Sequence, residues 1–284
     1  MTGVGFAGLG RMGQAMAPRL VAAGFDLAVW NRSPGVAIEG ASPVHSPADL
    51  WQGAGVVLCM LRDAGATAQV IDALGQRPGG LVCDMATHAP ADALALAERA
   101  RSLGLRYAEA PVGGTVAPAR AGQLIIFAAG DDADLDELAP LLAPLARVVH
   151  GMGPVGAGAR MKMAMNLLLT VWWQGLSEAL ALAEAGGLDR AQVLDVLADS
   201  PAATPALAVK RAILLGQPAP VGFDLAGVLK DMRAVARTLA DGGLSAPAAA
   251  GTFEAVAAAV AAGFGAQDVA DLARFRRLAG GLNG

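Results

Sequence analysis

A line of polar side chains interrupts the most apolar run of this sequence. Lys162, Asn166, Thr170, Gln174 and Glu178 follow one another at intervals of four residues, and nearly all residues between them are apolar. On an α-helix this spacing forms one narrow stripe, because residues four apart lie on neighbouring turns. A lysine in such a stripe can donate a proton to a carbonyl oxygen, and an amide one turn away can orient the carbonyl compound. The alternative is a stripe along solvent, with the ammonium group of Lys162 reaching out to water.

A second group of residues, near the N-terminus, has the pattern of a phosphate-binding turn. The sequence GLGRMG follows the β-rich run VGFAG and precedes a helical pattern. In this context Gly8 permits a tight turn, Gly10 lets the backbone approach a pyrophosphate, and Gly13 lets helix and strand pack closely. The N-terminus of the helix then faces the anion. The pattern predicts a dinucleotide site, with a purely structural turn as the alternative; its residues are Gly8, Leu9, Gly10, Arg11, Met12 and Gly13.

The type of dinucleotide depends on the end of the second predicted strand. NAD sites usually carry an acidic residue there, which binds the ribose 2′-hydroxyl. This sequence has Asn31, Arg32 and Ser33 instead. A guanidinium beside a hydroxyl can bind a 2′-phosphate. We therefore expect NADP(H) to be preferred, with NAD(H) possible; the alternatives are a solvated arginine and an asparagine that only shapes the turn.

The elements that must position these residues divide the chain in two. Up to about residue 150, short β-rich runs alternate with helical patterns, which predicts an α/β fold with a doubly wound, mostly parallel sheet. The runs QLIIFAAG and RVVH are expected to extend that sheet. After Gly158 the remainder predicts five or so helices and no strand. We therefore expect a dinucleotide-binding domain at 1–156 and an all-α domain at 157–284, whose first long helix lines a cleft with its polar stripe.

Composition and charge exclude several classes of function. The chain has 284 residues and a net charge of −4, with no basic stripe for a nucleic acid. Apolar runs are interrupted before they reach the ~20 residues that a membrane span requires. Cys59 and Cys83 lie in predicted strands, and no signal peptide precedes the first apolar run, so the cytoplasm is expected. The three histidines are dispersed, which argues against a metal site; His88 is expected to be a plain loop residue or to reach the ribose or substrate.

Five stretches, in order, resemble the β-hydroxyacid dehydrogenase family over essentially the whole chain. They are GLGRMGQAMAPRL, DMATHAP, EAPVGGTVAPARAGQL, GPVGAGARMKMAMN and FDLAGVLKDMRA. By position, Lys162 corresponds to the catalytic lysine of the family and Asn166 to its substrate-contacting asparagine. The resemblance also implies a homodimer, or a tetramer built from two such dimers, in which the long apolar helix is covered.

The same resemblance implies further contacts. A loop for the substrate carboxylate is expected at Gly113, Gly114 and Thr115, where backbone N–H groups and a hydroxyl can bind an anion. Cofactor contacts are implied for Met60, Leu61 and Thr87, and Lys230 is implied to reach both cofactor and substrate beside Asp231. Without the resemblance, Lys230 and Asp231 would be an exposed helix ion pair or two unrelated surface charges.

Two positions depart from the family pattern. Gly113 stands where the family usually has serine in the carboxylate loop, and Ala86 stands where it has serine before the threonine. The loss of the serine at position 113 removes a side-chain donor, which Thr115 can replace. The identity of the substrate therefore stays open.

The sequence predicts an NADPH-preferring oxidoreductase that transfers a hydride between nicotinamide and a small β-hydroxyacid or semialdehyde. The 3-hydroxyisobutyrate, tartronate semialdehyde, glyoxylate and succinic semialdehyde types are all candidates. An imine reductase or reductive aminase is the alternative enzyme, although Lys162 argues against it because those enzymes typically have another residue there. A catalytically silent NADP-binding module is the alternative outside enzymes.

Overall fold

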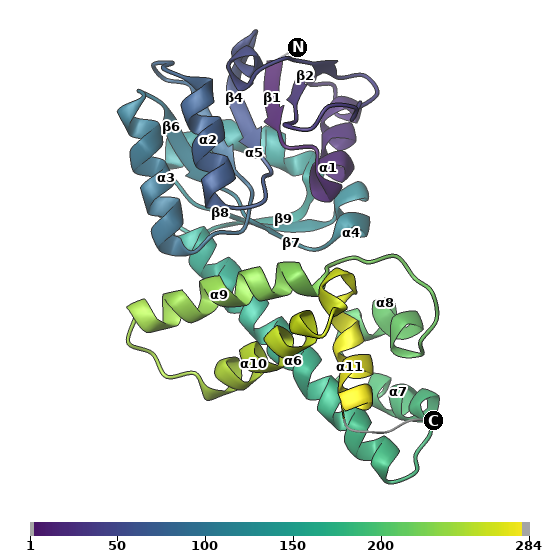
Figure 1. Cartoon of the computed structure of the whole chain (residues 1–284). Coiled ribbons are helices and arrows are strands. Elements are labelled where there is room, and N and C mark those ends of the chain that lie inside the picture. The colour runs from purple at the N-terminus through teal and green to yellow at the C-terminus, as the bar shows by residue number, and fades with distance from the viewer. Residues whose placement is uncertain (1–2, 280–284) are drawn as a thin grey trace. The chain divides into compact units, whose positions relative to one another are not determined.

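The computed structural model describes residues 3–279, in two compact units that are divided between Met165 and Asn166 (Figure 1). The first unit contains strands and helices, and the described part of the second contains helices only. The division falls inside the long helix α6 (Ala157–Ala185), which carries the polar stripe.

A six-stranded sheet forms the centre of the first unit. Its order is β3-β2-β1-β4-β5-β6, and every neighbouring pair is parallel. The strands are β1 (Gly3–Ala7), β2 (Asp26–Trp30), β3 (Ser42–Pro43), β4 (Ala54–Cys59), β5 (Leu81–Asp84) and β6 (Arg106–Glu109). The doubly wound parallel sheet expected from the sequence is confirmed. The strand order reverses between β1 and β4, and in such sheets the carboxyl ends at the reversal flank the ligand site.

Helices cover both faces of this sheet. They are α1 (Arg11–Ala22), α2 (Ala64–Leu74), α3 (Pro90–Ser102) and α5 (Asp132–Leu142). The short helix α4 (Val116–Arg120) packs against α1, and 3-10 turns lie at Pro47–Trp51 and Ala143–Leu145. One apolar core joins α1 and α5 to the sheet through Leu20 and Leu138, and the other joins α2 and α3 through Ile71 and Leu96. These cores hold the strand ends, and therefore the turns that follow them, in fixed positions.

The later strands differ from the sequence-based expectation. Instead of extending the large sheet, β7 (Val112–Gly113), β8 (Leu124–Ala128) and β9 (Ala146–Gly151) form a separate three-stranded sheet. A single bridge between Glu109 and Ala129 lies where the two sheets meet. The chain passes from β6 to β7 through Pro111, which has no N–H to donate to a ladder, so the strand breaks there.

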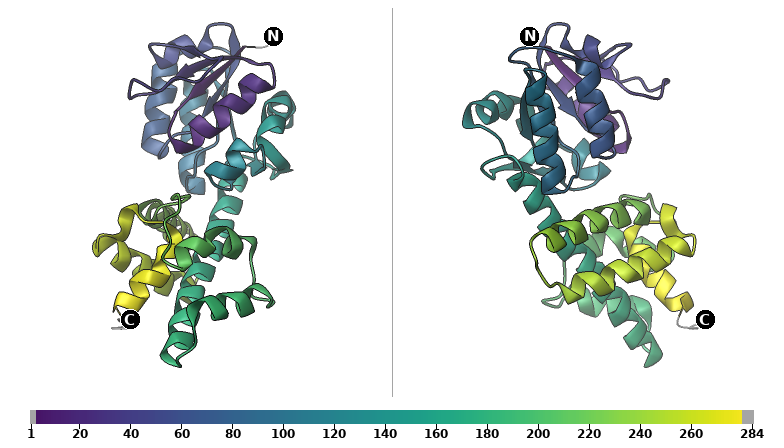
Figure 2. Two further views of the ribbon diagram at one scale, coloured as in Figure 1. Left: turned by 90° about the vertical axis from the view of Figure 1, so that its right-hand side faces the viewer. Right: turned by 60° about the vertical axis from the view of Figure 1, so that its left-hand side comes forward.

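The second unit is helical, as expected. After α6 come α7 (Arg190–Ala198), α8 (Pro205–Leu214), α9 (Leu225–Asp241), α10 (Pro247–Ala261) and α11 (Leu272–Ala279), with 3-10 turns at Phe264–Ala266 and Val269–Asp271 (Figure 2). Its apolar core includes Trp173 and Leu180 of α6, Leu229 of α9 and Val256 of α10. Within residues 3–279, no helix has the length and apolar character needed to cross a membrane.

Candidate active site

The three glycines of the GLGRMG turn have different structural surroundings. Gly8 has φ +102°, and a Cβ there would lie 2.4 Å from the carbonyl oxygen of Met60. A Cβ at Gly13 would lie 1.9 Å from the carbonyl oxygen of Gly8. At Gly10, by contrast, a Cβ would meet no atom within 4 Å. The fold itself therefore requires glycine at the first and third positions, whereas Gly10 borders open space at the N-terminus of α1, where a pyrophosphate would bind.

A cavity of about 600 Å³ opens over this turn. It gathers residues from the carboxyl ends of three neighbouring strands, β1, β2 and β4. Ten of the predicted cofactor residues line it: Gly8, Gly10, Arg11, Met12, Gly13, Asn31, Arg32, Ser33, Met60 and Leu61. The lining of the cavity does not include Leu9, which is buried beneath the turn, Thr87, which lies on the loop after β5, or Lys230, which lies on α9. Its glycine turn and open helix N-terminus are suited to the phosphates of a dinucleotide.

Asn31 organises the rim of this cavity. Its Oδ1 accepts a hydrogen bond from the backbone N–H of Leu9 at 3.0 Å, and its Nδ2 donates to the carbonyl oxygen of Ser33 at 2.9 Å. The side chain thus connects the glycine turn to the loop that carries Arg32. Arg32 and Ser33 are exposed, with their backbone held by these bonds.

Several residues of the cavity were not predicted from the sequence. Arg62 is the most relevant, because it adds a second exposed guanidinium to the lining; it lies 2.7 Å from the carboxylate of Asp63. Trp30 and Gln69 also line the cavity. The position of Arg62 in the chain could have indicated its place in the cavity. It closely follows β4, the strand next to β1, and parallel neighbours end at the same edge of a sheet.

The predicted carboxylate loop packs against the start of the long helix. Gly114 has φ +128°, which favours glycine, and Thr115 precedes α4 as its N-cap residue. A Cβ at Gly113 would lie 3.0 Å from Sδ of Met165 on α6. The thioether of Met165 therefore lies close to the space that a serine at position 113 would occupy, and it would have to shift by a few tenths of an ångström to admit one.

A buried carboxylate holds the first turn of α6. Oε1 of Glu109 accepts hydrogen bonds from the backbone N–H groups of Gly156, Gly158 and Ala159, at 2.7, 2.9 and 3.2 Å. Burial raises the pKa of Glu109 above its usual range, although the three N–H groups oppose that shift. Because Glu109 ends β6, the large sheet and the helix that carries Lys162 are joined directly.

The polar stripe on α6 faces protein over most of its length. Lys162, Asn166, Thr170 and Gln174 are 5–8% exposed, and only the last member, Glu178, is exposed. The interpretation of Lys162 as a solvent-reaching side chain is therefore wrong. Apolar side chains occupy the outer side of the helix instead, with Leu168 72% and Leu182 79% exposed.

Asn166 forms part of a polar chain in the second unit. Its Nδ2 donates to Oδ2 of Asp231 on α9 at 2.7 Å, and Nζ of Lys230 lies 3.0 Å from the other carboxylate oxygen. Oδ1 of Asp231 is buried. Its contact with Lys230 is an ion pair without the geometry of a hydrogen bond. Asp231 is 5% exposed, so it is not half of a surface ion pair. A carboxylate in this place fixes the asparagine amide, whose orientation matters for any substrate it contacts.

Two protein-family models together match most of the chain. A model for the NAD binding domain of 6-phosphogluconate dehydrogenase matches residues 3–153, and one for the NAD-binding region of NADP-dependent 3-hydroxyisobutyrate dehydrogenase matches residues 156–276. Glyoxylate/succinic semialdehyde reductase 1 of Arabidopsis thaliana is 34% identical over 93% of this chain and 95% of its own length. The 3-hydroxyisobutyrate dehydrogenase of Pseudomonas aeruginosa is 36% identical over 70% of each chain.

Solved structures show the same fold. The 3-hydroxyisobutyrate dehydrogenase of Mycobacterium tuberculosis with L-serine has a TM-score of 0.85 at 29% identity, and the match covers 98% of this chain and 99% of that one. A reductive aminase from Aspergillus terreus has a TM-score of 0.65 at 23% identity over 97% and 99%, and this likeness shows the fold alone. The chain belongs to the β-hydroxyacid dehydrogenase family of nicotinamide-dependent oxidoreductases, as the sequence motifs implied.

Proposed function

We propose that this protein is an NADPH-preferring reductase of small aldehydes or keto acids that carry a carboxylate, and that it also oxidises the corresponding hydroxyacids. The observation that carries the proposal is the burial of Lys162 and Asn166 on one face of α6. A buried lysine and amide on an otherwise apolar helix are expensive to retain without a role. The relatives named as 3-hydroxyisobutyrate dehydrogenase and glyoxylate/succinic semialdehyde reductase support this substrate class.

The proton step is assigned to Lys162. When bound, the nicotinamide supplies the hydride that reduces the carbonyl carbon. Nζ of Lys162 donates a proton to the carbonyl oxygen, so that the product is a neutral alcohol and the lysine is left as the free amine. In the oxidative direction the same amine accepts the hydroxyl proton. Asn166 orients the substrate oxygen, and Asp231 fixes the asparagine amide through the 2.7 Å hydrogen bond.

The substrate carboxylate is assigned to Gly113, Gly114 and Thr115, since backbone N–H groups and a hydroxyl can bind an anion without a buried positive charge. Thr87 and Lys230 are assigned to the nicotinamide end of the cofactor, and Lys230 also to substrate. These assignments rest on the positions of the residues in the family motifs.

The preference for NADPH is assigned to Arg32 and Ser33 at the cavity rim. The absence of a carboxylate at the end of β2 removes the repulsion that a 2′-phosphate would meet, and Arg62 adds a second cation to the same lining. The family model named for an NADP-dependent enzyme supports the same choice.

The outer side of α6 supports a homodimer or a tetramer built from two dimers. Leu168 and Leu182 are exposed on a helix that is 29 residues long, and a second copy of the chain would cover them. Light scattering after size exclusion tests this, and a monomeric mass at micromolar concentration would refute it. The division at 156/157 and the cytoplasmic location stay predictions.

The test of the function is NADPH oxidation with a panel of short aldehydes and keto acids that carry a carboxylate. Lys162→Met should lower kcat by about 10²–10⁴-fold, the usual contribution of a positioned general acid, while NADPH still binds. Arg160→Met is the matched control, because Arg160 is an exposed cation on the same helix. Turnover that survives in Lys162→Met would contradict the assigned role, and reduction of imines rather than carbonyls would favour the reductive aminase alternative.

A further inference from the structure

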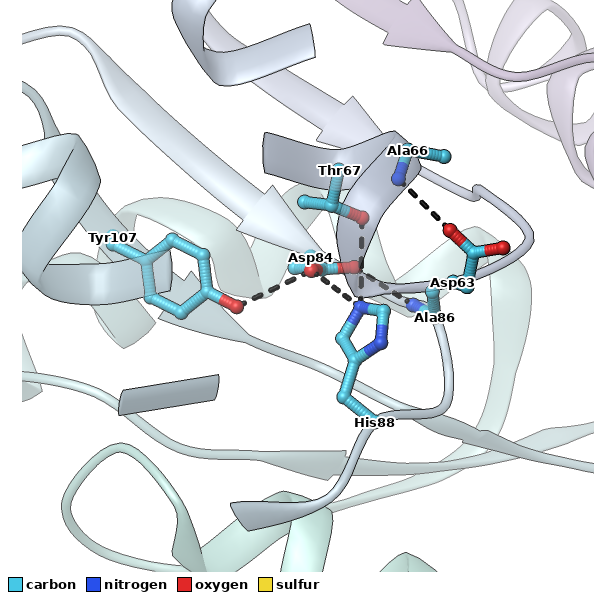
Figure 3. Close-up of polar contacts among 7 residues, drawn as sticks. All are labelled: Asp63, Ala66, Thr67, Asp84, Ala86, His88 and Tyr107. Carbon is cyan, nitrogen blue, oxygen red and sulfur yellow. Dashed lines mark hydrogen bonds and ion pairs between the residues drawn. The ribbon is translucent and has the colours of Figure 1, made fainter. Parts of the chain in front are cut away.

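His88 is buried in a polar cluster. The roles proposed above for proton transfer and cofactor binding do not involve this cluster. His88 is 5% exposed, and its partners Asp84, Tyr107 and Thr67 are equally enclosed, at 1%, 7% and 0%. Figure 3 shows the imidazole ring pointing toward the carboxylate of Asp84, with the Tyr107 hydroxyl approaching the same carboxylate. His88 lies on a loop, as expected from the sequence, but it is buried there and paired with a carboxylate.

Asp84 is the central acceptor of the cluster. Its Oδ2 lies 2.8 Å from Nε2 of His88 and accepts from the hydroxyl of Tyr107 at 3.2 Å, while Oδ1 accepts from the backbone N–H of Ala86 at 3.0 Å. The remaining contact joins Nε2 of His88 to Oγ1 of Thr67 at 3.5 Å. A carboxylate with several donors is strongly anchored, and the side chains that donate to it are anchored with it.

These residues come from the elements around the cofactor cavity. Asp84 is the last residue of β5, and His88 lies on the loop 85–89 that leads to α3. Thr67 lies on α2, the helix that contributes Ala66 and Gln69 to the cavity lining. The cluster therefore fastens the loop 85–89, which carries Thr87, to the helix beside the cofactor.

We propose that His88 is a positioning residue: its pairing with Asp84 holds the loop 85–89 in the conformation that presents Thr87 to the nicotinamide. This inference rests on the proposed function. It assigns to His88 no contact with the reacting atoms. Loss of the pair should leave the fold in place but let the loop sample other conformations, so that cofactor binding and turnover suffer together.

The charges around Asp84 support this role. Burial disfavours the carboxylate, yet the pairing with His88 lowers the pKa of Asp84 below its usual range. The other titratable groups that face it are Cys59 on β4, Cys83 on β5, and Tyr107 and Glu109 on β6. Burial raises the pKa of both thiols and of the phenol, so these three stay neutral near pH 7, and Glu109 disfavours a second negative charge. His88 therefore has the main part in keeping Asp84 ionised.

The experiment compares wild type, His88→Ala, His88→Gln and the control His45→Ala in the full-length protein, because His45 is exposed. NADPH affinity is measured by fluorescence titration, which needs no knowledge of the substrate, and the pH profile of kcat/KM is measured with the best substrate of the panel. His88→Ala should weaken NADPH binding roughly tenfold, the scale of one hydrogen bond to a charged group. It should also move the acidic limb of the profile to higher pH, because Asp84 then protonates more readily.

The conservative variant separates positioning from stability. The amide of His88→Gln can still donate to Asp84, so NADPH affinity should recover to within about threefold of wild type, a difference of about 0.7 kcal/mol. Melting temperatures show whether each variant is folded. If His88→Ala does not fold, Tyr107→Phe removes a donor to the same oxygen and should move the acidic limb in the same direction by a smaller amount.

Each result decides a different question. A wild-type protein that binds neither NADPH nor NADH would overturn the proposed function and this inference with it. A wild type that binds NADPH, together with a folded His88→Ala variant of equal affinity and unchanged pH profile, would overturn the inference alone. A His88→Gln variant as impaired as His88→Ala would also overturn it, because the hydrogen bond to Asp84 would then not explain the loss.

Discussion

Glu109 offers a test of how the sheet holds α6, the helix that carries Lys162. Glu109→Ala removes the acceptor of three backbone N–H groups at the start of α6. At about 1 kcal/mol for each lost hydrogen bond, the variant should lose about 3 kcal/mol. The first unit spans 165 residues, for which 1 kcal/mol corresponds to about 2–4 °C, so the melting temperature should fall by roughly 6–12 °C.

Glu109→Gln should behave differently, because it retains the acceptor oxygen and removes the charge. The pKa of Glu109 is raised by burial, with Asp84 acting in the same direction. For a carboxyl group with a raised folded-state pKa, the stabilising contribution is complete below its unfolded pKa and is lost as the pH rises through the folded pKa. Glu109→Gln does not titrate, so it does not lose stability in this way. Its melting temperature relative to that of wild type should therefore rise as the pH rises from 4 to 8.

Melting followed by circular dichroism across this pH range measures both effects, and kcat measured on the same samples shows whether Lys162 is still in place. Wild type at each pH is the control. If Glu109→Gln melts as low as Glu109→Ala at pH 7, the charge and not the acceptor holds the helix, and the reasoning is refuted.

Three further substitutions test other parts of the structure. Arg32→Ala should weaken NADPH binding roughly tenfold to a hundredfold and NADH binding by much less, because only NADPH carries the 2′-phosphate; equal losses in fluorescence titrations would contradict the assignment. Gly113→Ser should cost about 1–3 kcal/mol by crowding Met165, and Met165→Ala should relieve part of that cost in a double-mutant cycle; additive changes would exclude the contact. Lys210→Met should cost about 3–5 kcal/mol by leaving Asp268 unpaired, since Nζ lies 2.5 Å from its carboxylate in a buried pair; an unchanged urea midpoint would show that the pair is dispensable.

The alternation of strands and helices, the glycine turn and the polar stripe could be read directly from the sequence. Each has a period or spacing that depends only on neighbours along the chain. The separate sheet β7-β8-β9 could not be read in this way, because β-rich runs do not reveal their partners. Pro111 lies between two such runs, and a proline in that place indicates that a strand ends there.

The missed site residues depend on contacts between distant segments. Arg62 reaches the cavity because β4 lies beside β1, and the sequence does not state which strands are neighbours. His88 is followed by an alanine and a proline, and nothing in that local context shows that Tyr107 and Thr67 approach from other elements. The spacing correctly predicted a polar stripe on α6. Whether the stripe faces solvent or protein depends on how the helix packs, which the spacing does not show.

The GLGRMG turn shows that one motif can be maintained by two unrelated requirements, one for the fold and one for cofactor binding. In a library with every residue at positions 8, 10 and 13, sorting for folded protein should reject substitutions at Gly8 and Gly13, where a Cβ would strike backbone oxygen, and tolerate alanine at Gly10. Sorting the same library for cofactor binding should then reject the Gly10 variants. A nucleotide site could therefore be lost in evolution through Gly10 while the protein keeps its fold, and such a descendant would still carry two of the three glycines as a record of its ancestry.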